Sequence, residues 1–155
     1  MTLSAEFSAL VSTVDQLKAD LKALPASSRL DEDDINAIYA LAYNLLKQGR
    51  HDEALKYFSL LSLYRPVDSK ILVGLAVTYQ MLQMLDQAIN VYSFAAVVEP
   101  ENPEHMLSMA QCQIAQHAFA AAVDSLDIVI RFCTQNEGFD RIKQQAEALR
   151  TFATT

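Results

Sequence analysis

Apolar residues recur along this chain at helical spacing, and their arrangement returns every 34 residues. Each period holds an alanine and, four positions later, a large apolar residue: Ala54 with Phe58, Ala88 with Tyr92, and Ala122 with Leu126. Proline follows in two of the periods, at positions 66 and 100, and threonine takes the equivalent place at position 134. Because proline lacks an N–H and clashes with the preceding turn, it ends a helix. The pattern predicts three units, each made of two antiparallel helices.

The first helix of each unit repeats a second register. A small residue, Ala42, Ala76 or Ala110, is expected where it crosses closely over the alanine of the second helix. The core-facing residues predicted for these three helices are Ile38, Leu41, Ala42 and Leu45, then Leu72, Leu75, Ala76 and Tyr79, then Met106, Met109, Ala110 and Gln113.

Helix-boundary signals agree with this register. The acidic run at residues 31–34 suits a helix N-terminus, where its side chains cap free N–H groups and meet the positive end of the helix dipole. Gly49 suits the end of the first helix of the first unit, and Pro103 suits the first position of a new helix.

Both ends of the chain carry a further amphipathic segment. The C-terminal one predicts a helix that covers the last unit, through Phe139, Ile142, Ala146, Leu149 and Phe152. The N-terminal one spaces its apolar residues by four and three as in a heptad repeat, and they are Leu3, Phe7, Leu10, Val14, Leu17 and Leu21. The flanking positions carry few charges. Two interpretations stay open, a cap folded onto the first unit and a self-association seam between two copies.

A 34-residue pair of helices is the unit of the tetratricopeptide-repeat (TPR) family, which this chain resembles. The fold expected is all-α, a superhelix of three helix-hairpin repeats. We predict an N-terminal amphipathic helix and linker over residues 1–30, three repeats over 31–136 (about 35–68, 69–102 and 103–136), and a capping helix over 137–155.

Composition argues against several classes of function. The formal net charge is −7 and no basic stripe is visible, which disfavours nucleic acid and anionic membrane surfaces as partners. Three glycines do not build several phosphate-binding loops, and the three histidines form no metal-binding motif. Cys112 and Cys133 lack metal or CxxC spacing, so we expect buried thiols in a reduced cytoplasmic setting. We predict no enzyme activity, no metal and no cofactor.

Because TPR arrays curve, the first helix of each repeat lines the concave side. The ligand-facing stripe of these helices is too apolar to be merely solvated, which is typical of an interaction site. Tyrosine provides rigid area with a polar tip, glutamine can hydrogen-bond a peptide backbone, and methionine adapts its shape. The predicted groove for an extended peptide consists of Tyr39, Tyr43, Leu46, Val73, Gly74, Val77, Gln80, Met81, Leu107, Gln111 and Ile114.

Four segments also resemble one particular group of TPR proteins, the class II chaperones of bacterial type III secretion. They are residues 38–44 (IYALAYN), 49–58 (GRHDEALKYF), 68–76 (DSKILVGLA) and 87–93 (QAINVYS). The resemblance implies a small acidic cytoplasmic chaperone that holds a hydrophobic secreted translocator protein by a short extended segment. It also implies self-association through the N-terminal helix. The alternative is a TPR scaffold that joins folded partners in a secretion or envelope assembly.

Overall fold

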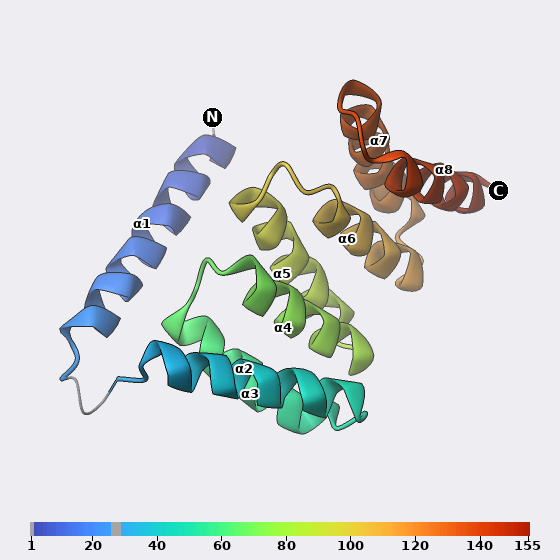
Figure 1. Ribbon diagram of the computed structural model, residues 1–155. Helices are drawn as coiled ribbons and strands as arrows, with labels where there is room; N and C mark the ends of the chain where they lie inside the picture. The colour runs from blue at the N-terminus through green and yellow to red at the C-terminus, as the bar shows by residue number, and fades with distance from the viewer. Residues whose placement is uncertain (1, 26–28) are drawn as a thin grey trace. The chain divides into compact units, whose positions relative to one another are not determined.

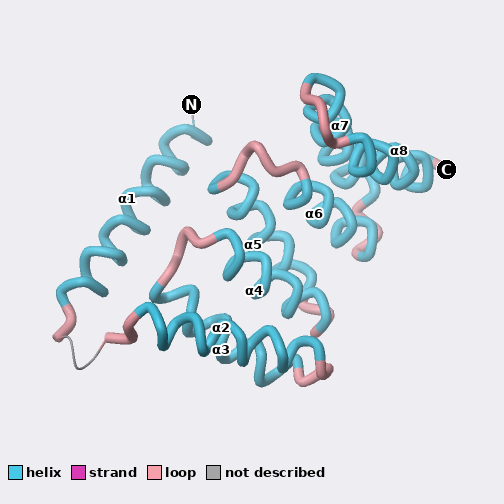
Figure 2. Tube along the Cα trace, in the orientation of Figure 1, coloured by secondary structure: helices cyan, strands magenta, loops and turns pink. Residues whose placement is uncertain are grey.

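The computed structural model describes residues 2–25 and 29–155, and for part of the first helix it describes the backbone alone. Within these residues the chain forms helices and no strand, which confirms the all-α prediction (Figures 1 and 2). The helices are α1 (Thr2–Ala23), α2 (Glu32–Lys47), α3 (His51–Tyr64), α4 (Ser69–Met81), α5 (Leu85–Val98), α6 (Glu104–Ala115), α7 (Phe119–Gln135) and α8 (Asp140–Thr154).

The chain divides into two compact units, Met1–Leu72 and Val73–Thr155, and the division falls inside α4. The first unit holds α1, α2, α3 and the first turn of α4. The second unit holds the rest of α4 and the four helices that follow. None of the helices in the described part is long and apolar enough to cross a bilayer.

The acidic run before α2 is a helix cap, as the sequence predicts. The Asp31 carboxylate accepts a hydrogen bond of 2.8 Å from the Asp34 N–H, and the Asp34 carboxylate accepts one of 3.2 Å from the Asp31 N–H. This reciprocal pair is a capping box, which satisfies two N–H groups that the helix leaves free.

The same turn joins the two helices of every repeat. Gly49, Gln83 and His117 are 34 residues apart, and all three have positive φ, at 78°, 59° and 61°. In the first turn the Arg50 N–H reaches the Leu45 carbonyl at 3.0 Å and the Gly49 N–H reaches the Leu46 carbonyl at 3.2 Å. These two bonds define the Schellman motif, which needs a left-handed residue. Glycine takes that conformation without strain, so the sequence reveals this turn at Gly49. The other two repeats form the same turn with Gln83 and His117, which the sequence does not reveal.

The core of the first unit lies between α2 and α3, which pack along each other. Ala42 and Ala54 are fully buried, together with Phe58 and Leu61. The two alanines allow the helices to approach closely, as the register predicts. One core prediction is wrong: Leu41 is 44% exposed. It therefore lies at the surface of the first unit, outside the core between α2 and α3.

The second unit has two core clusters. The first gathers Ala76, Ala88, Tyr92 and Cys112 from α4, α5 and α6. The second joins α6, α7 and α8, and its buried members are Leu107, Ala110, Leu126, Val129, Cys133, Ile142 and Ala146. Because α8 contributes Ile142 and Ala146 to this cluster, it is the capping helix that the sequence predicts.

Proline decides where the second helices end. The residues that end α3 and α5, Arg65 and Glu99, share one non-helical geometry (φ −131° and −133°, ψ 68° and 70°), and a proline follows each. The third repeat has Thr134 in place of proline, and α7 continues to Gln135 before its last turn is closed by the Asn136 N–H on the Phe132 carbonyl.

The six apolar residues of the N-terminal heptad pattern fall on α1, whose backbone is helical from Thr2 to Ala23 and contacts α3. Their side chains, those of Leu3, Phe7, Leu10, Val14, Leu17 and Leu21, lie outside the described part of the structure. Both interpretations of the seam therefore remain predictions.

The Gly49 turn gives a stability prediction. A Cβ added at Gly49 meets no atom within 4 Å, so the cost of Gly49→Ala comes from the left-handed backbone alone. We expect the free energy of unfolding to fall by about 1 kcal/mol, measured by urea titration. The matched control is Ala40→Gly in the exposed middle of α2, where the reverse change costs helix propensity instead. An unchanged midpoint for Gly49→Ala would show that this turn tolerates a side chain.

Candidate functional site

In the first unit, the side of α2 that the sequence predicts to face a ligand carries two stacked tyrosine rings. The rings of Tyr39 and Tyr43 are stacked, with centroids 6.4 Å apart and planes 12° apart. Tyr39 also meets the buried ring of Phe58 edge-on, at 6.1 Å and 80°. The Lys47 ammonium stands 4.6 Å from the centre of the Tyr43 ring, in cation–π geometry. We call Tyr39, Tyr43, Leu46 and Lys47 the α2 face.

Burial differs along this face. Tyr39 and Leu46 are half-buried, whereas Tyr43 is 44% exposed. Burial raises the pKa of the Tyr39 phenol, and the nearby Tyr43 and Asp68 raise it further because they disfavour a second negative charge. The Tyr39 phenol therefore stays neutral, and its ring lies between the buried Phe58 ring and the exposed Tyr43 ring.

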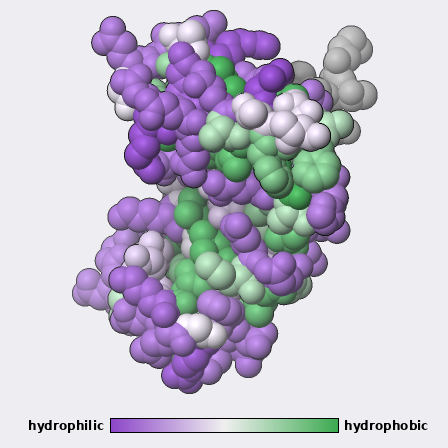
Figure 3. Space-filling view, turned by 90° about the vertical axis from the view of Figure 1, so that its right-hand side faces the viewer, coloured by the Kyte–Doolittle hydropathy of each residue, from purple (hydrophilic) through white to green (hydrophobic). Residues whose placement is uncertain are grey.

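In the second unit, the equivalent side of α4 carries Val73, Gly74, Val77 and Gln80, all half-buried, and Met81, which is 55% exposed. We call Val77, Gln80 and Met81 the α4 face. Val77 packs against the cluster around Ala76 and Ala88, so it is anchored, while Met81 offers a flexible apolar side chain to solvent. On the side of the molecule drawn in Figure 3, hydrophobic residues likewise reach the surface beside strongly hydrophilic ones.

A buried partner of this face was not predicted from the sequence. The Tyr92 hydroxyl donates a hydrogen bond of 3.1 Å to Gln80 Oε1. Tyr92 is almost fully buried, and burial raises its pKa to about 12. The sequence does hold a signal for this pair. Glutamine occurs at position 80, where the other repeats have Leu46 and Ile114, and tyrosine occurs at position 92, where they have Phe58 and Leu126.

On α6, one residue of the predicted groove is buried instead of lying at the surface. Gln111 and Ile114 are half-buried and reach the surface. Leu107 is 5% exposed and belongs to the core cluster between α6, α7 and α8. The reason is the capping helix, whose Ile142 and Ala146 share that cluster. Leu107 therefore presents almost no surface to a ligand, and we remove it from the candidate groove.

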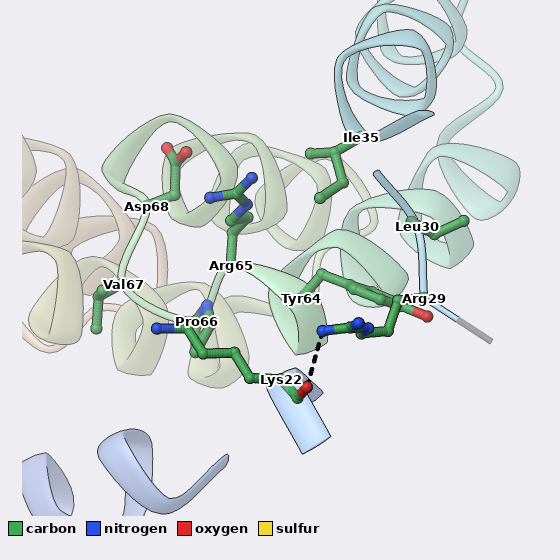
Figure 4. A pocket seen from close by; sticks show the side chains of 9 residues that line it. All are labelled: Lys22, Arg29, Leu30, Ile35, Tyr64, Arg65, Pro66, Val67 and Asp68. Atoms are coloured by element: carbon green, nitrogen blue, oxygen red, sulfur yellow. Dashed lines mark hydrogen bonds between the residues drawn. The ribbon is translucent and has the colours of Figure 1, made fainter. Parts of the chain in front are cut away.

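A pocket of about 510 Å³ lies in the first unit, where the end of α1, the linker and the end of α3 meet (Figure 4). Its lining residues are Lys22, Arg29, Leu30, Ile35, Tyr64, Arg65, Pro66, Val67 and Asp68. Two of its charged side chains interact with the ends of helices. Arg29 Nη1 donates a hydrogen bond of 2.8 Å to the Lys22 carbonyl at the end of α1, and Arg65 pairs with Glu32 in the first turn of α2. Cations at helix C-termini and anions at N-termini complement the helix dipole, so we assign this pocket a structural role.

Within the described residues, histidine, cysteine and carboxylate side chains form no group that could hold a metal ion. Cys112 and Cys133 are buried and free, as expected from their spacing. Burial raises the pKa of the Cys112 thiol to about 11. Burial also raises the pKa of Cys133, against the opposing charge of Lys143. A buried thiol that stays protonated is a poor nucleophile.

Comparison with known proteins finds both sequence and structural relatives. The sequence model of the family described as "Psidin, N-terminal TPR repeats region" matches residues 29–125. The chain is 23% identical over 122 residues to the low calcium response locus protein H of Yersinia pestis, a match that spans 79% of this chain and 73% of that protein. It is 27% identical over 100 residues to the chaperone protein SicA of Salmonella typhimurium, spanning 64% of this chain and 61% of SicA.

Among solved structures, the fold resembles the type III secretion chaperone SycD of Yersinia enterocolitica, crystallised with a peptide of the translocator YopD. The TM-score is 0.72 at 23% identity, and the match covers 80% of this chain and 95% of SycD. At this identity the likeness shows a shared fold, which agrees with the TPR architecture built from the sequence register.

The buried thiols give a test of the packing in the second unit. At pH 8 a thiol with a pKa of about 11 is ionised about 100-fold less than one of pKa 9.0, and only the thiolate reacts. We expect iodoacetamide to leave Cys112 unlabelled in the native protein and to label it readily in urea, as followed by mass spectrometry. Stoichiometric labelling of Cys112 under native conditions would contradict this packing.

Proposed function

The chain belongs to the tetratricopeptide-repeat family described as the Psidin N-terminal TPR repeats region, and from this premise we propose that it is a secretion chaperone. In this proposal it binds an extended segment of a type III secreted, translocator-type protein and keeps that protein soluble and competent for export. It works in the cytoplasm by binding alone, without catalysis, metal or cofactor.

One observation carries the proposal. The first helices of the repeats expose large, adaptable or aromatic side chains, Tyr43 on α2 and Met81 on α4, beside anchored neighbours. A rigid base with an exposed apolar tip is the surface chemistry of an interaction hot spot. The likeness to SycD, whose structure holds a peptide of the translocator YopD, supports a peptide as the ligand of these helices. The chaperone name of SicA supports the same class of function.

The ligand-facing residues follow from this proposal. In the first unit we assign Tyr39, Tyr43 and Leu46 to the binding surface. In the second unit we assign Val73, Gly74, Val77, Gln80, Met81, Gln111 and Ile114. Each unit is taken by itself, so its contribution is tested separately.

The test compares matched exposed residues on the two kinds of helix. Tyr43→Ala and Met81→Ala each remove an exposed apolar side chain from a first helix. Leu63→Ala on α3 and Val97→Ala on α5 remove residues that are 52% and 43% exposed on second helices. Overlapping synthetic peptides that cover the translocator-type protein recovered with the chain from its native cells serve as ligands, with affinity measured by isothermal titration calorimetry.

We expect Tyr43→Ala and Met81→Ala to weaken peptide binding by about 1–3 kcal/mol each, because truncating a hot-spot residue costs about that much. The second-helix variants should bind like the unchanged chain, and all four should unfold at similar temperatures. Equal losses for first-helix and second-helix variants would exclude the first helices as the binding surface. Recovery of folded partners that no peptide displaces would favour a scaffold instead.

We further propose that the α1 seam mediates self-association, as the resemblance to the type III secretion chaperones implies; its heptad spacing is compatible with this role and with a cap. Sedimentation equilibrium of the full chain and of a chain that begins at residue 26 gives the test. We expect a dimer for the full chain at micromolar concentration and a monomer for the shortened one. Two monomers would leave α1 as a cap on the first unit, a role compatible with its contact with α3.

A further inference from the structure

The second repeat differs from its neighbours at two linked positions. Its ligand-facing helix carries Gln80, where the first and third repeats carry Leu46 and Ile114. Its second helix carries Tyr92, where the others carry Phe58 and Leu126. The positions are apolar in two repeats and polar in one, and in that one the two polar side chains are hydrogen-bonded to each other at 3.1 Å.

The direction of that bond fixes the Gln80 amide. Tyr92 is buried and its pKa is raised to about 12, so its hydroxyl is protonated at neutral pH. The nearby Ser108 side chain lowers this pKa in part, but burial outweighs it. The phenol proton is then given to Gln80 Oε1. Because the carbonyl end of the amide is held by Tyr92, its Nε2 end is left to donate elsewhere.

The residues around Gln80 indicate which acceptor its side-chain N–H would bind. Val77 and Met81, one turn before it and next to it on the α4 face, are apolar. An extended peptide on such a surface buries its apolar side chains there, but its main-chain carbonyls still need donors, since an unpaired buried carbonyl is costly. A single oriented N–H in an apolar surface suits one main-chain carbonyl. Because every residue has such a carbonyl, this contact does not depend on the peptide's sequence.

We propose that Tyr92 is a positioning residue that orients Gln80, so that the Gln80 amide N–H binds a main-chain carbonyl of an extended peptide at the second repeat. The inference rests on the proposed function and adds to it a sequence-independent contact. This would let the site accept varied apolar segments while holding their backbone in one register.

Three variants separate orientation from packing. Tyr92→Phe keeps the ring in the core and removes the hydroxyl. Gln80→Leu removes the donor. The double variant recreates the Phe58 and Leu46 pair of the first repeat, so it has a native precedent for folding. Tyr79→Phe is the control, because Tyr79 packs against the same cluster and its hydroxyl lies outside the proposed contact.

Binding is measured by calorimetry with the tightest peptide from the tiled set. We expect Tyr92→Phe and Gln80→Leu each to weaken binding about two- to tenfold, the loss that follows from one hydrogen bond. The double variant should bind no more weakly than Gln80→Leu, because Tyr92 acts through Gln80. Tyr79→Phe should bind like the unchanged chain. In peptides with one backbone amide replaced by an ester, one position should cost affinity in the unchanged chain and no longer cost it in Gln80→Leu, while every other position affects both chains alike.

Additive losses in the double variant, or variants that all bind like the unchanged chain, would overturn the inference and leave the proposed function standing. A loss caused only by core damage would lower the unfolding temperature of Tyr92→Phe while the ester scan stayed the same for both chains, which also overturns it. Failure of the unchanged chain to bind any peptide would overturn the inference and the proposed function together. This outcome is distinct from the others because it appears before any variant is tested.

Discussion

The close approach of the two helices in each repeat is the constraint on which the rest of the structure depends. Alanine stands on both helices of all three repeats, and all six alanines are fully buried. Because alanine has only a methyl group, the two helix backbones can lie close together at these positions. The large residue four positions after each second-helix alanine, Phe58, Tyr92 or Leu126, is buried in the core. Close packing leaves little room for change at these positions, which is why the register is kept so strictly over the 34-residue period.

The turns inside the repeats show how one backbone solution is reached by different residues. Gly49 takes the left-handed conformation freely, whereas Gln83 and His117 take it at a cost that the surrounding helices must offset. The same bonds from N–H to carbonyl close all three turns. The packed helices thus determine the turn conformation, because three different residue types adopt it. Where the next proline is missing, in the third repeat, the helix simply runs further and α8 meets a longer α7.

On this regular frame the residues proposed to face a ligand vary from repeat to repeat. The first unit offers stacked tyrosines with a lysine over one ring, and the second offers valine, methionine and glutamine. A surface that is mainly apolar and adaptable gives area, while its few polar groups give direction to a bound chain. The Tyr92–Gln80 hydrogen bond links core and surface, since a residue at a repeated core position orients a residue on the surface.

The sequence by itself determined the fold class, the three repeats, the capping of α2 and the role of α8, because helical periodicity, alanine spacing and proline act within one or two turns of chain. It also predicted which sides of α2 and α4 carry exposed apolar residues such as Tyr43 and Met81. The tertiary structure decided what depends on a neighbour far along the sequence. Leu107 is buried in the cluster that α8 completes, whereas Leu41 is exposed although the sequence places it with the buried Ala42. The partner of Gln80 lies 12 residues away on another helix. Exposure and hydrogen bonding are properties of packed surfaces, and helical spacing alone cannot say which element will cover a given face.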